Sequence, residues 1–248
     1  MSREDRLAYL VSQLGSDERY AIGARRFPGY VTSDDAVAIA EALADEFDEG
    51  CAERAALAQA QGMQMACSAG CNGCCTIVVV VYLPEALRIA RWLDEPENAE
   101  ARARFLAAYP AWRERLGEDV EQLPKLFRDG KQAEYDALHM KVWRKQALCA
   151  FNHDGMCSIY AVRPIACRNA HALDTAERCV PDPPDAKPPH AVSFVPLEQF
   201  LKQSNRLLRA THNASSSQRH HQEALCSAVY NLLSKPSPSS SARPAKQR

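Results

Sequence analysis

The chain has 248 residues, of which 46% are hydrophobic and 25% charged, and this composition predicts a globular protein and argues against wholesale disorder. Thirty basic and 31 acidic residues give a net charge of -1, so we expect no nucleic-acid partner. The longest apolar run, residues 77–83, is far shorter than the ~20 residues of a membrane helix, and the first residues lack the basic start and apolar core of a secretory signal. We therefore expect a cytoplasmic protein that does not enter a membrane.

The apolar spacing predicts a mostly α-helical protein with at most a small two-stranded β element. Residues 1–62 are predicted to form an N-terminal helical segment with one helix over 3–14. A second, long helix follows an N-cap at Thr32 or Ser33. Its expected buried face consists of Val37, Ala40, Leu43, Phe47 and Cys51.

Residues 63–180 are predicted to be a cysteine-cluster metal-binding domain. The β-branched run 77–82 predicts an extended segment, which we expect to pair with the cysteine-bearing loops. Pro84 is expected in the first turn of a helix that ends at Pro96. Further helices are predicted near residues 97–116 and 131–147, with Trp92, Trp112 and Trp143 in the core.

The last part of the chain is predicted in three pieces. Residues 181–195 form a proline-rich linker, and residues 196–233 form two helices that pack on the core. The second of these helices carries Ala224, Leu225, Ala228, Val229 and Leu232 on one face. Residues 234–248 are rich in serine and proline, which is typical of a disordered tail.

The ten cysteines are unusual for a chain that is long enough to bury its own core without disulfides. In a reducing compartment, clustered thiols are more often metal ligands than disulfide partners. The first cluster places four cysteines within nine residues, and Gly70 and Gly73 allow tight turns around a metal. The second set consists of Cys149, Cys157 and Cys167, with Cys179 further on, and an Asp154-Gly155 turn signal lies just before Cys157. The predicted ligands are Cys67, Cys71, Cys74, Cys75, Cys149, Cys157, Cys167 and Cys179.

The charge around such a site gives two further expectations. Four thiolates with a divalent ion or a [4Fe–4S] cluster carry about -2, which Arg163 and Arg168 are placed to offset. Tyr160 is expected to pack beside the site. The neighbouring side chains of Cys74 and Cys75 diverge, so either they serve two sites or only one of them serves a cluster. The spacing leaves this partition open, as it does the choice between zinc and iron.

These strings resemble the bacterial CxxCxxCC cysteine-cluster family, the YkgJ-type zinc- or iron-chelating proteins. The resemblance covers residues 67–83 and 149–168, with weaker support at Glu85 and Cys179. The chain departs from the family pattern because three residues, not two, separate Cys67 from Cys71. The resemblance implies a metal-binding domain that holds zinc, iron or an iron–sulfur cluster. The cysteine pattern is also similar to that of flagellin lysine methyltransferases, which implies an alternative function as an S-adenosylmethionine-dependent protein lysine N-methyltransferase.

Other classes fit the sequence less well. The spacing of Cys67, Cys71 and Cys74 matches radical S-adenosylmethionine enzymes, but no repeating strand–helix pattern follows it. A nucleophilic thiol with His153 or His171 as its base would not need so many cysteines. A structural zinc site without catalysis remains an open alternative, and so does an enzyme.

Several residues are expected to have no role at the site. Cys51 and Cys226 are predicted to be core residues on helical faces with no partner nearby. The remaining histidines of the C-terminal region are expected to be solvated, namely His212, His220 and His221.

Overall fold

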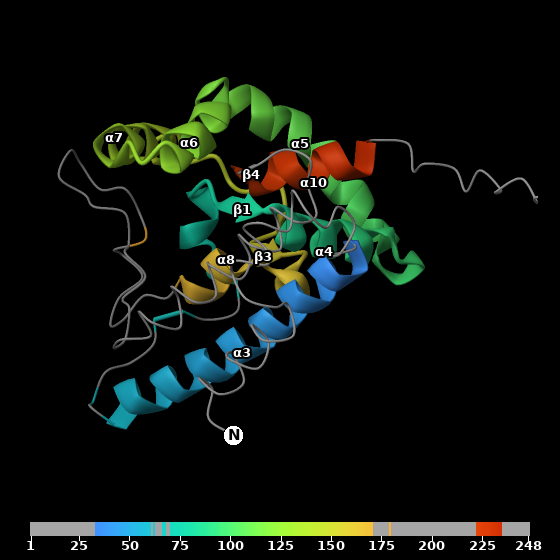
Figure 1. The fold of residues 1–248 in the computed structure, drawn as a ribbon. Helices are drawn as coiled ribbons and strands as arrows, with labels where there is room; N and C mark the ends of the chain where they lie inside the picture. Colours follow the sequence, from blue (N-terminus) through green and yellow to red (C-terminus); the bar gives the residue numbers. More distant parts are fainter. Residues whose placement is uncertain are drawn as a thin grey trace, which may run out of the picture.

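The computed structural model of the chain describes residues 33–60, 62, 66–67, 70–170, 179 and 222–234. These residues form a mostly helical structure with two small two-stranded sheets, which confirms the predicted fold class (Figure 1). The described helices are α3 (Ser33–Ala60), α4 (Leu83–Asp94), α5 (Ala99–Leu116), α6 (Asp119–Arg128), α7 (Gln132–Trp143), α8 (Ile165–Asn169) and α10 (Leu225–Ser234). The short turns are η1 (Gly73–Thr76), η2 (Pro96–Asn98) and η3 (Tyr160–Val162). Among the described helices, none is both long and apolar enough to cross a membrane.

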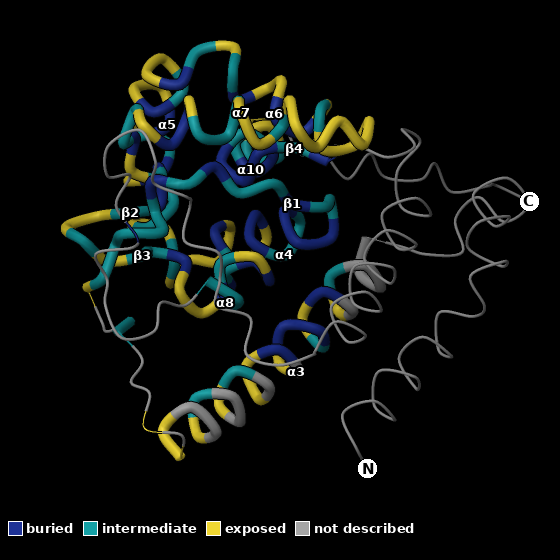
Figure 2. Tube along the Cα trace, turned by 90° about the vertical axis from the view of Figure 1, so that its left-hand side faces the viewer, coloured by how far each residue is buried: buried dark blue, intermediate teal, exposed yellow. Residues whose placement is uncertain are grey.

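Helix α3 is the long N-terminal helix that the sequence predicts, and it lies along one side of the described residues (Figure 2). Its buried residues recur every three or four positions, at Ala40, Leu43, Ala44 and Phe47. This spacing places them on one stripe of the helix. Helix α3 packs against α4 and α8, so it supports the short helix that carries Cys167.

The core lies between α4, α5 and α10. Ile89 and Leu93 of α4 are fully buried, as are Phe105 and Leu116 of α5. Helix α5 continues through Pro110, and its buried residues lie on one face between Phe105 and Leu116. Tyr109 joins α5 to α10, because its ring stacks on Tyr230 at a centroid distance of 3.9 Å and its hydroxyl donates to Ser227 Oγ at 3.3 Å.

The strand pairing differs from the prediction. Strand β1 (Val80–Tyr82) pairs antiparallel with β4 (Gln222–Ala224), and not with the cysteine-bearing loops. The loop after Cys149 instead forms its own hairpin from β2 (Asn152–His153) and β3 (Met156–Cys157). Residues 222–224 are therefore strand, and the last helix starts only at Leu225. A hydrogen bond from Leu225 N to Val79 O, 2.8 Å long, continues the pairing. Backbone pairing with β1 thus outweighs the helical apolar spacing of residues 222–224.

One helix ends earlier than predicted, and another was not predicted. Helix α7 ends at Trp143, four residues early, and Gln146 follows with a φ of 47° that cannot continue a helix. Helix α6 was not predicted, and it continues through Pro124. The predictions for residues 3–14, for the linker 181–195, for the first C-terminal helix and for the tail beyond Ser234 fall outside the described residues.

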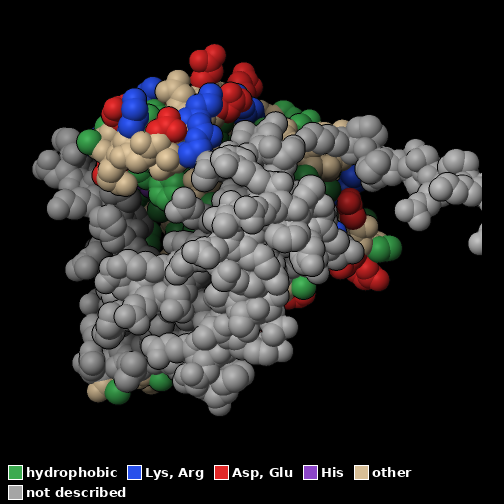
Figure 3. All heavy atoms as spheres, in the orientation of Figure 1, with side chains coloured by type: hydrophobic (Ala, Val, Ile, Leu, Met, Phe, Trp, Pro, Cys, Tyr) green, Lys and Arg blue, Asp and Glu red, His purple; other side chains and the backbone are tan. Residues whose placement is uncertain are grey.

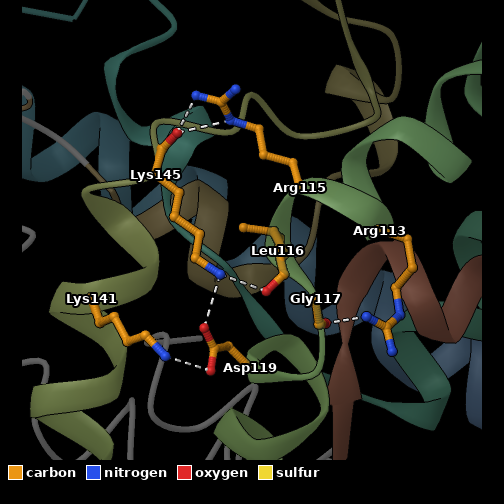
Figure 4. A network of polar contacts seen from close by, with 7 residues as sticks. All are labelled: Arg113, Arg115, Leu116, Gly117, Asp119, Lys141 and Lys145. Atoms are coloured by element: carbon orange, nitrogen blue, oxygen red, sulfur yellow. Dashed lines mark hydrogen bonds and ion pairs between the residues drawn. The ribbon is translucent and has the colours of Figure 1, made fainter.

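A polar network ties α5, α6 and α7 together just before Cys149 (Figure 4). Lys145 Nζ donates to the carbonyl of Leu116 at 2.7 Å and to Asp119 Oδ2 at 2.8 Å. Lys141 Nζ donates to Asp119 Oδ1 at 3.0 Å. The two hydrogen bonds of Lys145 therefore fix the chain just before it enters the second cysteine segment. Elsewhere the described part of the surface at the top of Figure 3 carries basic and acidic side chains side by side.

Asp119→Asn should reduce the free energy of unfolding at neutral pH by about 1–2 kcal/mol, because it removes charge-assisted hydrogen bonds. Hydrogen bonds from Lys145, and then from Lys141, hold the pKa of Asp119 below its usual 3.8. The folded-state pKa is thus lower than the unfolded one, so this stabilisation exists above pH 3.8 and is lost as the pH falls through the folded-state pKa. Urea unfolding of wild type and Asp119→Asn, from neutral pH down to below the folded-state pKa of Asp119, measures this difference in stability.

The matched control is Asp94→Asn, which affects an exposed ion pair with Arg102. Its effect should stay within about 0.5 kcal/mol. A pH-independent difference between wild type and Asp119→Asn would contradict the assignment.

Candidate metal centre

The first cysteine cluster is held by the turn η1. Cys75 N donates to Asn72 O at 2.9 Å, which closes the turn. The buried hydroxyl of Thr76 donates to Gly73 O at 3.0 Å and accepts from Trp143 Nε1 at 3.1 Å. Helix α7 therefore anchors the backbone of Cys74 and Cys75 through one side-chain hydroxyl.

A backbone hydrogen bond joins the two cysteine segments. Cys149 N donates to Cys75 O at 2.7 Å. Phe151, two residues later, stacks on Phe105 of α5 with ring centroids 4.0 Å apart. The second segment is thus fixed on one side to the first cluster and on the other to the helical core.

The hairpin β2–β3 carries Cys157. Asp154 and Gly155 form its two-residue turn with φ values of 49° and 80°, as a type I′ turn requires, and this confirms the predicted turn. A Cβ added at Gly155 would lie 3.6 Å from Gly70 O, so the turn packs against the first loop. Cys157 stands opposite Asn152 in the pairing.

Helix α8 carries Cys167, and buried polar groups hold it in place. Glu85 of α4 is 7% exposed and accepts from Tyr82 N at 3.2 Å and from Ile165 N at 3.0 Å. Because burial disfavours its charged form, the pKa of Glu85 is raised. This carboxyl group ties the start of α8 to the start of α4.

Arg168 differs from its predicted role. Its guanidinium donates to the carbonyls of Arg163 and Ala161 at 2.8 and 2.7 Å and pairs with Asp48 of α3. Arg168 is not among the described residues that line the cavity between the two cysteine segments. Its donors hold the loop before α8, so we correct its assignment from offsetting the thiolate charge to structural support.

The two segments enclose a cavity of about 490 Å³. Seven of the eight predicted ligands line it, and these come from both segments. They are Cys67, Cys71, Cys74, Cys75, Cys149, Cys157 and Cys167. Cys226 of α10 lines it as well, which brings eight of the ten cysteines to one space. The wall also contains apolar and aromatic residues, among them Trp112, Phe151, Ile159 and Leu225.

Cys179, the remaining predicted ligand, does not line this cavity in the described residues. It lies against the first cluster, because a Cβ added at Gly73 would be only 2.5 Å from Cys179 Cβ. The charges of Cys67 and Cys71 contribute, after burial, to raising the pKa of its thiol. Gly73 is therefore required by a close contact and not by a left-handed backbone.

The thiols influence one another strongly. A hydrogen bond from Cys74 lowers the pKa of Cys75 to about 6, and the same contact, together with burial, raises the pKa of Cys74. Burial, together with the charges of Cys149 and Cys75, raises the pKa of Cys157 to about 11 and that of Cys167 well above its usual value. Several thiolates at once are therefore unfavourable here unless a positive charge lies between them.

Two buried donors face this group of sulfur atoms. Arg163 Nε is buried without a hydrogen-bond partner, and its positive charge lowers the pKa of Cys157 and Cys167. The guanidinium lies 4.1 Å above the ring of Tyr160, which also lines the cavity. Asn152 Nδ2 makes no hydrogen bond of normal length, although it acts on the Cys75 thiol and lowers its pKa. Donors of this kind stabilise thiolate sulfur.

The remaining cysteines and histidines singled out in the sequence have different surroundings. Cys51 is half-buried on α3, and its thiol donates to Arg168 O at 3.4 Å. His153 is exposed and pairs with Asp154 at 3.2 Å. His171, His212, His220 and His221 fall outside the described residues. Cys226 is buried as predicted, but the expectation that it has no partner is wrong, since its Sγ lies 3.5 Å from Cys149 Sγ.

As they stand, no three Cys, His, Asp or Glu side chains of the described residues form a group that could hold a single metal ion. Searches with family models, among curated proteins and among solved structures find no match to this chain. The resemblance to the CxxCxxCC family therefore stays a prediction that rests on the motifs alone.

Gly73→Ala should lower the free energy of unfolding by about 1–3 kcal/mol, because the new methyl group would overlap Cys179 Cβ. The double variant Gly73→Ala/Cys179→Gly removes the overlapping carbon and should recover part of this loss. Denaturant unfolding of the wild type, both single variants and the double variant measures the coupling. Additive effects would show that the two residues do not touch.

Proposed function

We propose that the protein binds a thiolate-held metal centre, of zinc or of iron including an iron–sulfur cluster, between its two cysteine segments. The observation that carries the proposal is that seven cysteines from residues 67–75 and 149–167 line one cavity. A cysteine that only fills a protein core behaves as a small hydrophobic residue. Such cysteines are not expected to cluster around one cavity.

The donor set suits such a centre. Thiolate sulfur is the preferred ligand of structural zinc and of iron–sulfur clusters. Arg163 would offset the negative charge of the ligands, and the amide of Asn152 would donate to the Cys75 sulfur. The metal would supply the positive charge that several neighbouring thiolates need.

The ligands would complete their arrangement by rotating about χ1, which moves a cysteine sulfur by ångströms and leaves the backbone in place. The backbone contacts that fix the two segments, including the bond from Cys149 N to Cys75 O, do not involve the sulfur atoms. The backbone can therefore already have the shape of the metal-bound protein while the sulfur atoms contact one another only in pairs.

Cys157→Ala should lower the affinity for the metal by more than about tenfold and lower the melting temperature as well, because a metal held between segments stabilises the fold. Cys51→Ala is the matched control, since its thiol bonds to Arg168 O outside the cavity. Metal content after anaerobic purification, acid-labile sulfide and the visible spectrum are measured on all three proteins. Wild type that binds neither zinc nor iron would refute the proposal.

The apolar wall of the cavity favours a second candidate, the S-adenosylmethionine-dependent lysine methyltransferase activity that the cysteine pattern suggests. A volume of about 490 Å³ lies within the usual range of small-molecule sites, and Met156 and Tyr160 on its wall are 52% and 63% exposed, so they offer surface to an organic ligand. A cofactor bound there would lie beside the cysteines.

Saturable binding of S-adenosylmethionine to the metal-loaded protein, measured by calorimetry, is the result expected of this enzyme. Tyr160→Ala should weaken the binding by at least about tenfold, the effect of losing one well-packed aromatic contact. Absence of binding to intact, metal-loaded protein would leave the metal-binding module without this activity.

A further inference from the structure

We propose that Cys226 is a ligand of the same metal ion as Cys149, so that α10 completes the centre from a third segment of the chain. The inference rests on the proposed metal-binding function and deepens it. It also replaces the sequence-based expectation that Cys226 is an ordinary core residue.

The first step is how Cys226 reaches the cavity. Strand β4 pairs with β1, and Leu225 N donates to Val79 O at 2.8 Å. These bonds fix the first turn of α10 against the segment that follows the first cysteine cluster. The position of Cys226 is therefore set by backbone pairing with the metal-binding segment, and it does not depend on the packing of its own side chain.

The second step is its surroundings. The Cys226 side chain is 2% exposed and lines the cavity together with seven predicted ligands. The nearby residues Ala224, Leu225 and Val229 are buried apolar residues, whereas Cys226 brings a sulfur atom to the cavity beside the sulfur of Cys149. Cys51, the other helical cysteine, contacts a backbone carbonyl and does not line the cavity in the described residues.

The third step is the distance between the two sulfur atoms. Cys149 Sγ and Cys226 Sγ are 3.5 Å apart. A tetrahedral metal with bonds of about 2.3 Å to sulfur separates two thiolates by about 3.8 Å. Two cysteines can therefore share one ion here with a shift of a few tenths of an ångström, and neither backbone has to move.

The test uses the full-length protein with Co²⁺ as the probe, in wild type, Cys226→Ser and Cys51→Ser. Serine keeps the size of the side chain but is a poor ligand for a thiolate site. We expect Cys226→Ser to lower the affinity for Co²⁺ by more than about tenfold and the sulfur-to-cobalt absorption per bound ion by about a quarter, the share of one thiolate in four. Cys51→Ser should match wild type in both.

A second measurement needs no substitution at the buried site. In cadmium-loaded wild type, NMR should show coupling from one cadmium resonance to the β protons of both Cys149 and Cys226. Coupling to Cys149 alone, or unchanged cobalt binding by Cys226→Ser, would overturn the role of Cys226 and leave the proposed function intact. Wild type that binds no metal would overturn both.

Discussion

The hydrogen bond from Cys149 N to Cys75 O, 2.7 Å long, sets the distance between two stretches of chain that are far apart in sequence. Because it uses only backbone atoms, it fixes both cysteine positions without occupying either sulfur. The stack of Phe151 on Phe105 and the bond from Trp143 to Thr76 hold the two ends of this contact against the helices. The shape of the cavity depends on this alignment.

The helices serve mainly to support irregular segments. Cysteines on the turn η1, on the hairpin and on the short helix α8 converge at angles that one long helix could not provide. Such segments leave backbone groups unpaired, and buried groups need partners. Glu85 fills this need for two helix starts, and Arg168 does so for two loop carbonyls. A buried carboxyl and a buried guanidinium outside the cavity are thus part of what gives the cavity its form.

Local patterns predicted the local structure well. The apolar stripe of α3, Pro84 at the start of α4 and the Asp154-Gly155 turn each depend on residues close in sequence, and all three are confirmed. The gathering of cysteines from residues 67–75 and 149–167 in one place was also anticipated from their spacing, although their role as ligands stays a prediction.

The errors concern contacts between distant segments. Nothing near residues 222–224 indicates a strand, because the partner β1 that makes them one lies far back in the chain. The same pairing brings Cys226 to Cys149, so a cysteine that looks isolated in the sequence has a neighbour in space. Arg168 follows a predicted ligand directly, yet its side chain turns to Asp48 of α3. Sequence proximity alone could not show that direction.

The pairing of Val80 with Ala224 also has a consequence for how the protein is made. Synthesis proceeds from the N-terminus, so the ribosome releases the first cysteine cluster long before the strand that lies beside it. Contacts between such distant residues form slowly, because a long loop must close first. The wall of the cavity is thus finished last, and until then the thiols of the first cluster lack the C-terminal segment that completes their surroundings.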